Sequence, residues 1–219
     1  MSAPRKRIAV LISGRGSNMR ALVEAARAPD YPAEVVLVIS NKVDAAGLAW
    51  ARDQGLPTAA IDHKAFPSRE AFDQAIDAAL RAADVDYVAL AGFMRIQSTG
   101  FVEKWAGRQI NIHPSLLPLF PGLHPQRQAL QAGVRVSGAT VHFVTPVLDS
   151  GPIIAQAVVP VVAGDTEDTL AARILTAEHK LYPQALALLV TGQARLEGNS
   201  VVLTAPVNQG QTLFSPDLI

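Results

Sequence analysis

Three residues of this chain, Asn111, His113 and Asp149, carry groups that together could stabilise and protonate an oxyanion. Asn111 and His113 lie two positions apart, so on an extended segment both side chains leave the backbone on the same face. An amide and an imidazole on one face can converge on a single substrate oxygen. A carboxylate such as Asp149, brought alongside by the fold, would hold the imidazole protonated and oriented. These parts suit a tetrahedral intermediate of acyl transfer.

Each of these residues also has an ordinary structural interpretation. A histidine after a strand often packs in the core or faces solvent, and Asp149 precedes Ser-Gly and could be a turn aspartate. The position of His113 favours the functional interpretation, because ligands of open parallel sheets bind outside the carboxyl ends of strands. Pro114 keeps the chain from continuing as a helix. Pro118 and Pro121 indicate a rigid loop, and Pro118 is compatible with a cis bond.

A second candidate site is the segment Ser13-Gly14-Arg15-Gly16-Ser17-Asn18, between a predicted strand and a predicted helix. Its small residues let the backbone approach an anion, while Ser17, Asn18 and the helix N-terminus supply donors. Met19 occupies the third glycine position of a dinucleotide fingerprint, and no Gly-Lys-Ser/Thr follows. We therefore expect a single phosphate here, with a tight strand-to-helix turn as the alternative.

Three further features have no role that the residues alone establish. The segment Ala91-Gly92-Phe93-Met94-Arg95-Ile96 could form a slot whose backbone groups bind a flat heterocycle between apolar side chains. The alternative interpretation is that this segment is only the end of a strand, with a buried Phe and Met. Glu178, on a predicted long helix, has a solvated surface position as its ordinary interpretation. His142 lies in an apolar strand and is expected to be a buried, hydrogen-bonded residue of the core or of the surroundings of the site.

The composition bounds the classes of protein to consider. The chain has 219 residues, 49% hydrophobic and 17% charged, which favours a well-buried sheet over a disordered protein. Basic and acidic residues number 19 each, so no overall positive field exists to hold nucleic acid. No apolar stretch approaches the ~20 residues that span a bilayer. With no cysteine and no metal-ligand spacing among five histidines, we expect no metal and a cytoplasmic location.

Strands and helices alternate along the first half of the chain, with short connections that predict right-handed crossovers and a parallel sheet. Strands are predicted over 8–12, 35–39, 58–61, 87–91 and 109–112, and helices over 18–28, 45–54, 68–83 and 101–105. The second half is predicted to contain a loop over 115–124, a helix over 126–132, antiparallel strands over 139–144 and 153–159, and a helix over 170–190 kinked at Pro183. A short hairpin and a loose end are expected from Arg195 onward.

These elements predict an α/β, Rossmann-like fold: a mostly parallel central sheet with flanking helices and an antiparallel C-terminal part. We find no repeat and no low-complexity linker, and expect a single domain over 1–219. Within it, 7–105 would form the phosphate-binding half, 106–190 the catalytic half, and 195–219 a tail.

Seven motifs agree in order and spacing with one enzyme family: Leu11–Asn18, Ser40–Lys42, Ala91–Ile96, Asn111–Pro118, Pro121–His124, Val141–Val144 and Leu148–Pro152. Together they resemble the phosphoribosylglycinamide formyltransferases, folate-dependent enzymes of purine biosynthesis within the formyltransferase superfamily. The likeness covers about residues 7–190. The Asn-x-His-Pro-Ser-Leu-Leu-Pro element is shared across the superfamily, whereas the Gly-x-Gly-Ser-Asn loop points to this family.

The resemblance implies a formyltransferase fold and transfer of a formyl group from 10-formyltetrahydrofolate to the amine of 5-phosphoribosylglycinamide. Asn111, His113 and Asp149 would be catalytic. The ribonucleotide would bind through Gly16, Ser17 and Asn18 at its phosphate and Glu178 at its ribose hydroxyls. The folate site would comprise Arg69, Met94, Arg95, Ile96, Gln97, Asn111, Thr145, Pro146, Val147, Leu148 and Asp149.

Two departures from the family pattern are visible. Leu119 replaces a basic residue often found after Leu-Leu-Pro, and Gln97 stands where an aliphatic residue is frequent, at the pteridine slot. The implied partners are small-molecule substrates, without nucleic acid or membrane, for a monomer or homodimer.

Other functions remain open. A formyltetrahydrofolate deformylase would activate water with the same His and Asp and usually carries an N-terminal regulatory domain, whereas six residues precede Arg7. A methionyl-tRNA formyltransferase would need a C-terminal RNA-binding domain, and the segment after Val190 is short and not basic. A third alternative is a non-catalytic nucleotide-binding or nicotinamide-dependent protein. Met19, and the absence of an acidic residue at Ser40-Asn41, count against dinucleotide binding.

Overall fold

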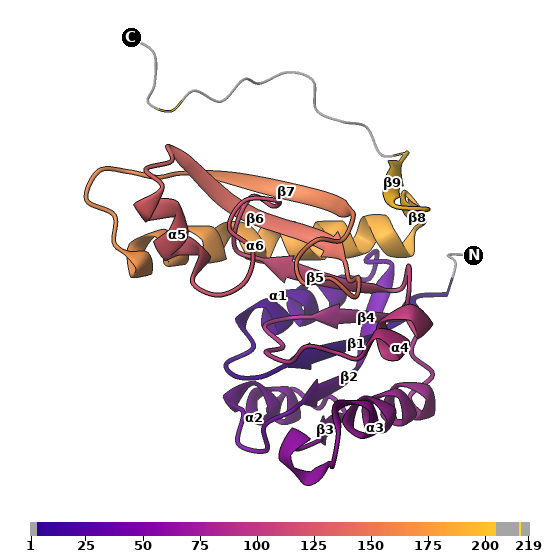
Figure 1. Cartoon of the computed structure of the whole chain (residues 1–219). Coiled ribbons are helices and arrows are strands. Elements are labelled where there is room, and N and C mark those ends of the chain that lie inside the picture. Colours follow the sequence, from indigo (N-terminus) through magenta and orange to yellow (C-terminus); the bar gives the residue numbers. More distant parts are fainter. Residues whose placement is uncertain (1–3, 205–214, 216–219) are drawn as a thin grey trace.

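A seven-stranded sheet runs through the computed structural model, which describes residues 4–204 and 215 (Figure 1). The strands lie in the order β3-β2-β1-β4-β5-β6-β7. The first five positions are parallel, and β6 and β7 are antiparallel to their neighbours. Their bounds are β1 Lys6–Ile12, β2 Ala33–Ser40, β3 Thr58–Ala60, β4 Tyr87–Leu90, β5 Gln109–His113, β6 Val136–Phe143 and β7 Ile153–Pro160. The predicted fold class, a mostly parallel sheet with an antiparallel C-terminal part, is confirmed.

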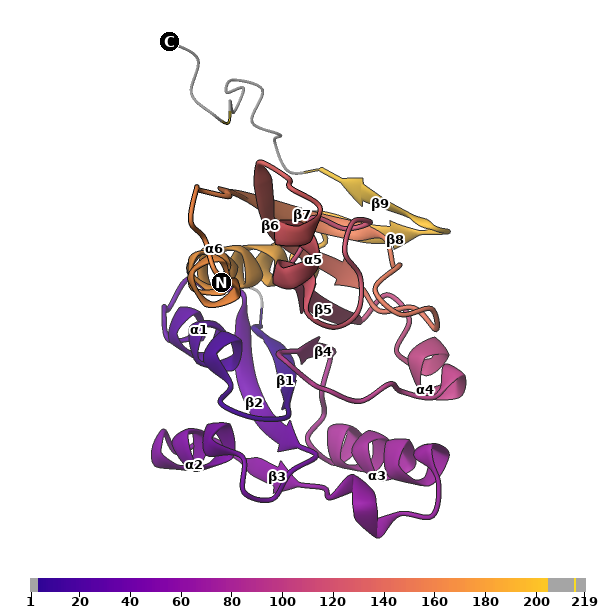
Figure 2. The same cartoon turned by 60° about the vertical axis from the view of Figure 1, so that its left-hand side comes forward.

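Helices cover both faces of this sheet (Figure 2). They are α1 Ser17–Ala26, α2 Ala46–Asp53, α3 Arg69–Ala82, α4 Thr99–Lys104, α5 Pro125–Gln131 and α6 Glu167–Val190, with a 3-10 turn at His63–Ala65. Buried side chains form one apolar cluster with α1, α2, α5 and α6, and a second with α3 and α4. Strand β1 contributes side chains to both clusters. Ile8, Val10 and Ile12 face the first cluster, while Ala9 and Leu11 face the second.

Local sequence signals explain where the longer helices begin. The Ser68 hydroxyl accepts a hydrogen bond from Ala71 N at 3.1 Å at the start of α3, and Thr166 with Thr169 forms a capping box on α6. Helix α6 passes through Pro183 and remains one continuous helix. The Tyr31 hydroxyl donates to the Pro183 carbonyl at 2.7 Å, which joins α6 to the connection between α1 and β2.

The predicted C-terminal hairpin is also present, as β8 Ala194–Glu197 and β9 Ser200–Leu203. The remaining residues expected to be a loose end lie outside the described part of the chain, apart from Ser215. The bond between Leu117 and Pro118 is cis, as the sequence allowed. No helix within residues 4–204 has the length and apolar character to cross a membrane.

Candidate active site

A cavity of about 510 Å³ lies where the segments after β4, β5 and β6 meet. It brings together all three candidate catalytic residues, Asn111, His113 and Asp149, and ten of the eleven residues expected to bind folate. Its wall consists of Leu90, 92–97, Val102, 111–114, 122–125, His142 and 144–149. Arg69 is the exception, because it lines an adjoining cavity of about 210 Å³ that shares Arg95 and Ile96 with the larger one.

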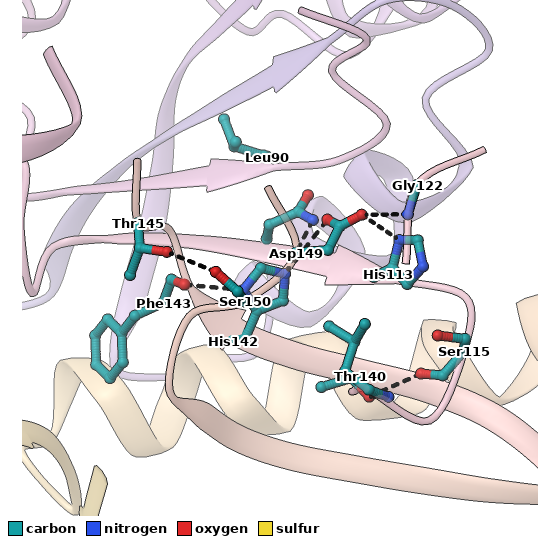
Figure 3. A network of polar contacts seen from close by, with 12 residues as sticks. Leu90, His113, Ser115, Gly122, Thr140, His142, Phe143, Thr145, Asp149 and Ser150 are labelled. Atoms are coloured by element: carbon teal, nitrogen blue, oxygen red, sulfur yellow. Dashed lines mark hydrogen bonds and ion pairs between the residues drawn. The ribbon is translucent and has the colours of Figure 1, made fainter. Parts of the chain in front are cut away.

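Asp149 occupies the centre of a buried polar network (Figure 3). Its Oδ2 lies 3.4 Å from Nδ1 of His113 and accepts a hydrogen bond from Gly122 N at 2.8 Å. Its Oδ1 lies 3.9 Å from Nε2 of His142. The side chains of His113 and Asp149 are each 7% exposed, so water screens their attraction only weakly. The structure thus places the carboxylate beside the imidazole, as expected.

His113 is held from its other side by the proline-rich loop. Its Nε2 lies 2.9 Å from the carbonyl oxygen of Phe120. Each ring nitrogen therefore faces an acceptor, and only an imidazolium can donate to both. Phe120 has a φ of 57°, in the left-handed region, which turns the loop back over the ring.

His142 orients the amide of Asn111 from the neighbouring strand, where the two residues are register partners. Its Nδ1 lies 2.8 Å from the carbonyl oxygen of Phe143, which can only accept, so Nδ1 carries the proton. Its Nε2 is then an acceptor and faces Nδ2 of Asn111 at 3.2 Å. Burial lowers the pKa of His142, which keeps the ring neutral at pH 7. One N–H of Asn111 is thereby fixed, and the other is left for a ligand.

The His142→Phe variant should lower kcat about tenfold, because it keeps a buried ring but removes the acceptor that orients Asn111. Tenfold corresponds to the loss of one hydrogen bond of about 1.4 kcal/mol. Steady-state kinetics at saturating substrates would measure it, with circular dichroism to verify the fold. A parent-like kcat would show that Asn111 needs no such support.

The candidate phosphate loop has the backbone expected of an anion site. Gly16 has a φ of 71° and immediately precedes Ser17, the first residue of α1. Gly47 supports the loop, because its N–H donates to the carbonyl of Gly14 at 3.0 Å. A Cβ on Gly47 would lie only 2.9 Å from that oxygen. Sequence reasoning overlooked Gly47, although a glycine inside a predicted helix was a usable signal of close approach.

Asn18 and Glu178, 160 positions apart, meet behind this loop. Asn18 Nδ2 donates to Glu178 Oε2 at 2.9 Å, and Asn18 Oδ1 is buried without a protein partner. Glu178 is only 5% exposed, so its interpretation as a solvated surface residue is wrong. Burial raises the pKa of Glu178 to about 6, against the opposing effect of the Asn18 bond. Neither residue lines the 510 Å³ cavity, so the loop and Glu178 form a separate group.

The raised pKa of Glu178 predicts a pH-dependent stability difference. Its folded pKa of about 6 exceeds its ordinary 4.5, so the folded state favours the neutral form. The stability this confers is complete below pH 4.5 and is lost as pH rises through 6. Between pH 4 and pH 7, the unfolding free energy of Glu178→Gln should therefore rise by about 2 kcal/mol relative to that of the parent. Urea denaturation at both pH values measures this gain. The exposed Glu103→Gln, as a control, should show none.

The two departures from the family pattern have different surroundings. Gln97 is 8% exposed and lines the cavity, and it accepts a hydrogen bond from the buried side chain of Gln109. Leu119 is 54% exposed on the proline-rich loop. In the 92–97 segment Phe93 is buried, but Met94 is 67% exposed, which contradicts a simple strand end with a buried Phe and Met.

Among residues 4–204 and 215, no three His, Cys, Asp or Glu side chains lie close enough to hold a metal ion. The polar side chains that meet around Asp149 in the described site are an amide and two imidazoles.

Comparison with known proteins identifies the family. The formyl transferase family model matches residues 6–186. Phosphoribosylglycinamide formyltransferase of Escherichia coli is 48% identical over 90% of this chain and 92% of its own length. A glycinamide ribonucleotide transformylase 1 structure from Symbiobacterium toebii superposes with a TM-score of 0.88 at 49% identity, covering 91% of this chain and 94% of that one.

Larger relatives contain the same region as one part. The trifunctional purine biosynthetic protein adenosine-3 of Drosophila pseudoobscura is 56% identical over 89% of this chain, which spans 14% of that protein. The match thus extends over nearly the whole of the single-function relative and a small share of the trifunctional one. Fold, site and similarity agree, and the chain belongs to the formyl transferase family.

Proposed function

We propose that this chain transfers the formyl group of 10-formyltetrahydrofolate to the amine of 5-phosphoribosylglycinamide. The products would be N-formylglycinamide ribonucleotide and tetrahydrofolate, in de novo purine (IMP) biosynthesis. The observation that carries the proposal is the single cavity that joins Asn111, His113 and Asp149 to the expected folate wall. The names of the full-length relatives support the same reaction.

The proposed reaction is an acyl transfer between two bound substrates. The amine of the ribonucleotide attacks the formyl carbon, and the formyl oxygen gains negative charge. The free N–H of Asn111 and an N–H of His113 would donate to that oxygen, while Asp149 stabilises the imidazolium. Both nitrogens of His113 face protein acceptors, so donation to substrate requires the ring to leave one of them.

Collapse of the intermediate breaks the bond between the formyl carbon and N10 of the folate. The proton lost by the amine must reach N10, through His113 or a bound water. The protein also contributes by holding the two substrates in line, which removes much of the entropic cost of their encounter. We propose that no metal takes part.

We assign the two substrates to the two separate groups of residues, the phosphate loop with Glu178 and the cavity. The phosphate would rest on the backbone of Gly16 and Ser17 at the start of α1, with Asn18 and Glu178 beneath the ribose. The folate would occupy the 510 Å³ cavity, and Arg69 would meet it from the adjoining cavity. We propose that these small molecules, and no nucleic acid, are the substrates, and that the protein acts in the cytoplasm as a monomer or homodimer.

An absorbance assay of folate deformylation tests the proposal. Purified protein is mixed with 10-formyltetrahydrofolate, with and without 5-phosphoribosylglycinamide. Tetrahydrofolate should form only when the ribonucleotide is present, and N-formylglycinamide ribonucleotide should accumulate in equal amount. Tetrahydrofolate formed at the same rate without the ribonucleotide would instead indicate a deformylase, in which water takes the place of the amine.

A further inference from the structure

Ser13 connects the phosphate loop to the wall of the folate cavity. It directly follows β1, and its backbone N–H donates to the carbonyl of Gly92 at 3.1 Å. Its hydroxyl accepts a hydrogen bond from Met94 N at 2.7 Å. Gly92 and Met94 both line the 510 Å³ cavity, and Gly14 of the phosphate loop is the next residue after Ser13.

The hydroxyl of Ser13 also fixes its own orientation through a second partner. It donates to Oδ1 of Asn41, just after β2, at 2.5 Å. Nδ2 of Asn41 in turn lies 3.3 Å from Nδ1 of His63, which borders the adjoining cavity with Arg69. Ser13 and Asn41 are 4% and 2% exposed, so water cannot readily replace either bond. Asn41 thereby gains a role that its sequence motif alone did not supply.

In the cavity wall at 92–97, Phe93 and Gln97 are buried, whereas Met94 and Ile96 depend less on packing. Met94 and Ile96 are 67% and 56% exposed, so their side chains bury little apolar surface against the protein. The Ser13 contacts to Gly92 and Met94 therefore contribute much of what positions this part of the wall. A ligand that orders the phosphate loop would order the wall through the same serine.

We propose that Ser13, held by Asn41, is a positioning residue that makes binding of the two substrates mutually dependent. A ribonucleotide on the phosphate loop fixes Ser13 and tightens the folate wall, and folate has the reverse effect by linkage. The inference rests on the proposed function, because the two ligands are its substrates. Ser13 does not itself line the 510 Å³ cavity, so it would act through Gly92 and Met94, which do.

The experiment uses an unreactive pair of ligands on the full chain. Tetrahydrofolate carries no formyl group, so its affinity can be measured by anaerobic calorimetry with and without 5-phosphoribosylglycinamide. In the parent, the ribonucleotide should lower the Kd of tetrahydrofolate about tenfold. In Ser13→Ala the factor should fall below about twofold, and the KM of the folate should rise with kcat nearly unchanged.

Two variants sharpen the comparison. Ser137→Ala is the matched control, because it also removes a buried serine hydroxyl, one without a protein partner, and should retain the parental factor. Asn41→Ala removes the partner of Ser13 and should reduce the coupling between the two ligands as Ser13→Ala does. It provides the same test if Ser13→Ala folds poorly. An unchanged factor in the folded Ser13 or Asn41 variant, or no coupling in a parent that binds both ligands, overturns the inference. A parent that binds no ribonucleotide contradicts the proposed function itself.

Discussion

Replacing Asn111 by alanine should lower kcat by about 10²–10³, with the folate KM changed much less. Removal of one preorganised oxyanion donor has a cost of this order, because the donor acts on charge that develops only in the transition state. We propose that Asn111 is such a donor. His142 fixes one N–H of its amide at 3.2 Å, while its side chain lines the cavity beside His113.

Single-turnover and steady-state kinetics would separate this effect on chemistry from any effect on binding. Asn199→Ala is a suitable control, since Asn199 is exposed in the β8–β9 turn and should leave kcat at the parental value. Asn111→Ala must also retain the parental circular dichroism spectrum. Full kcat in a folded Asn111→Ala would remove Asn111 from the proposed mechanism.

The order of strands and helices could be predicted because most strands are continuous apolar runs. The stretch Ile8–Ile12 is an example: the structure buries it on both faces, so no alternation was needed to recognise it. Strand β6 was predicted to begin at Ala139, but it begins at Val136. Ser137 and Gly138 interrupt the apolar pattern, so the first residues of this strand were not recognised. A Cβ on Gly138 would lie 1.9 Å from the carbonyl oxygen of Ala157, so only glycine fits there.

The site was predicted where its residues are neighbours in sequence, and less well where the fold joins distant ones. Asn111 and His113 could be paired by spacing alone. The contact between Asn18 and Glu178 depends on how α6 packs on α1, and no local pattern encodes that packing. The pairing of Asn111 with His142 likewise depends on the register of an antiparallel pair of strands. Ser13 was recognised as part of the phosphate segment, but its contacts were not predicted, because its partners lie on two other loops.

Replacing Asp149 by asparagine should lower kcat by on the order of 10⁴, the loss seen when an orienting carboxylate beside a catalytic histidine is replaced in the same way elsewhere. Asparagine is the informative substitution at this position. Asp149 has a φ of 49°, a left-handed conformation that asparagine tolerates and most other residues do not. Its oxygen can still accept from Gly122 N, so the loop keeps its anchor. The negative charge beside His113 is what the variant removes.

Asp84→Asn controls for the substitution itself. Asp84 has a φ of 48°, and its side chain is 97% exposed, so the same change in the same backbone conformation should leave kcat unaltered. A double-mutant cycle then asks whether Asp149 acts through the imidazole. If it does, the double variant His113→Asn, Asp149→Asn should be only as slow as the slower single variant, because residues acting as one unit lose their effect together. If the two losses multiply instead, Asp149 acts on the substrate or on Gly122 independently of His113. Its catalytic role would then not depend on placing a charge 3.4 Å from Nδ1 of His113.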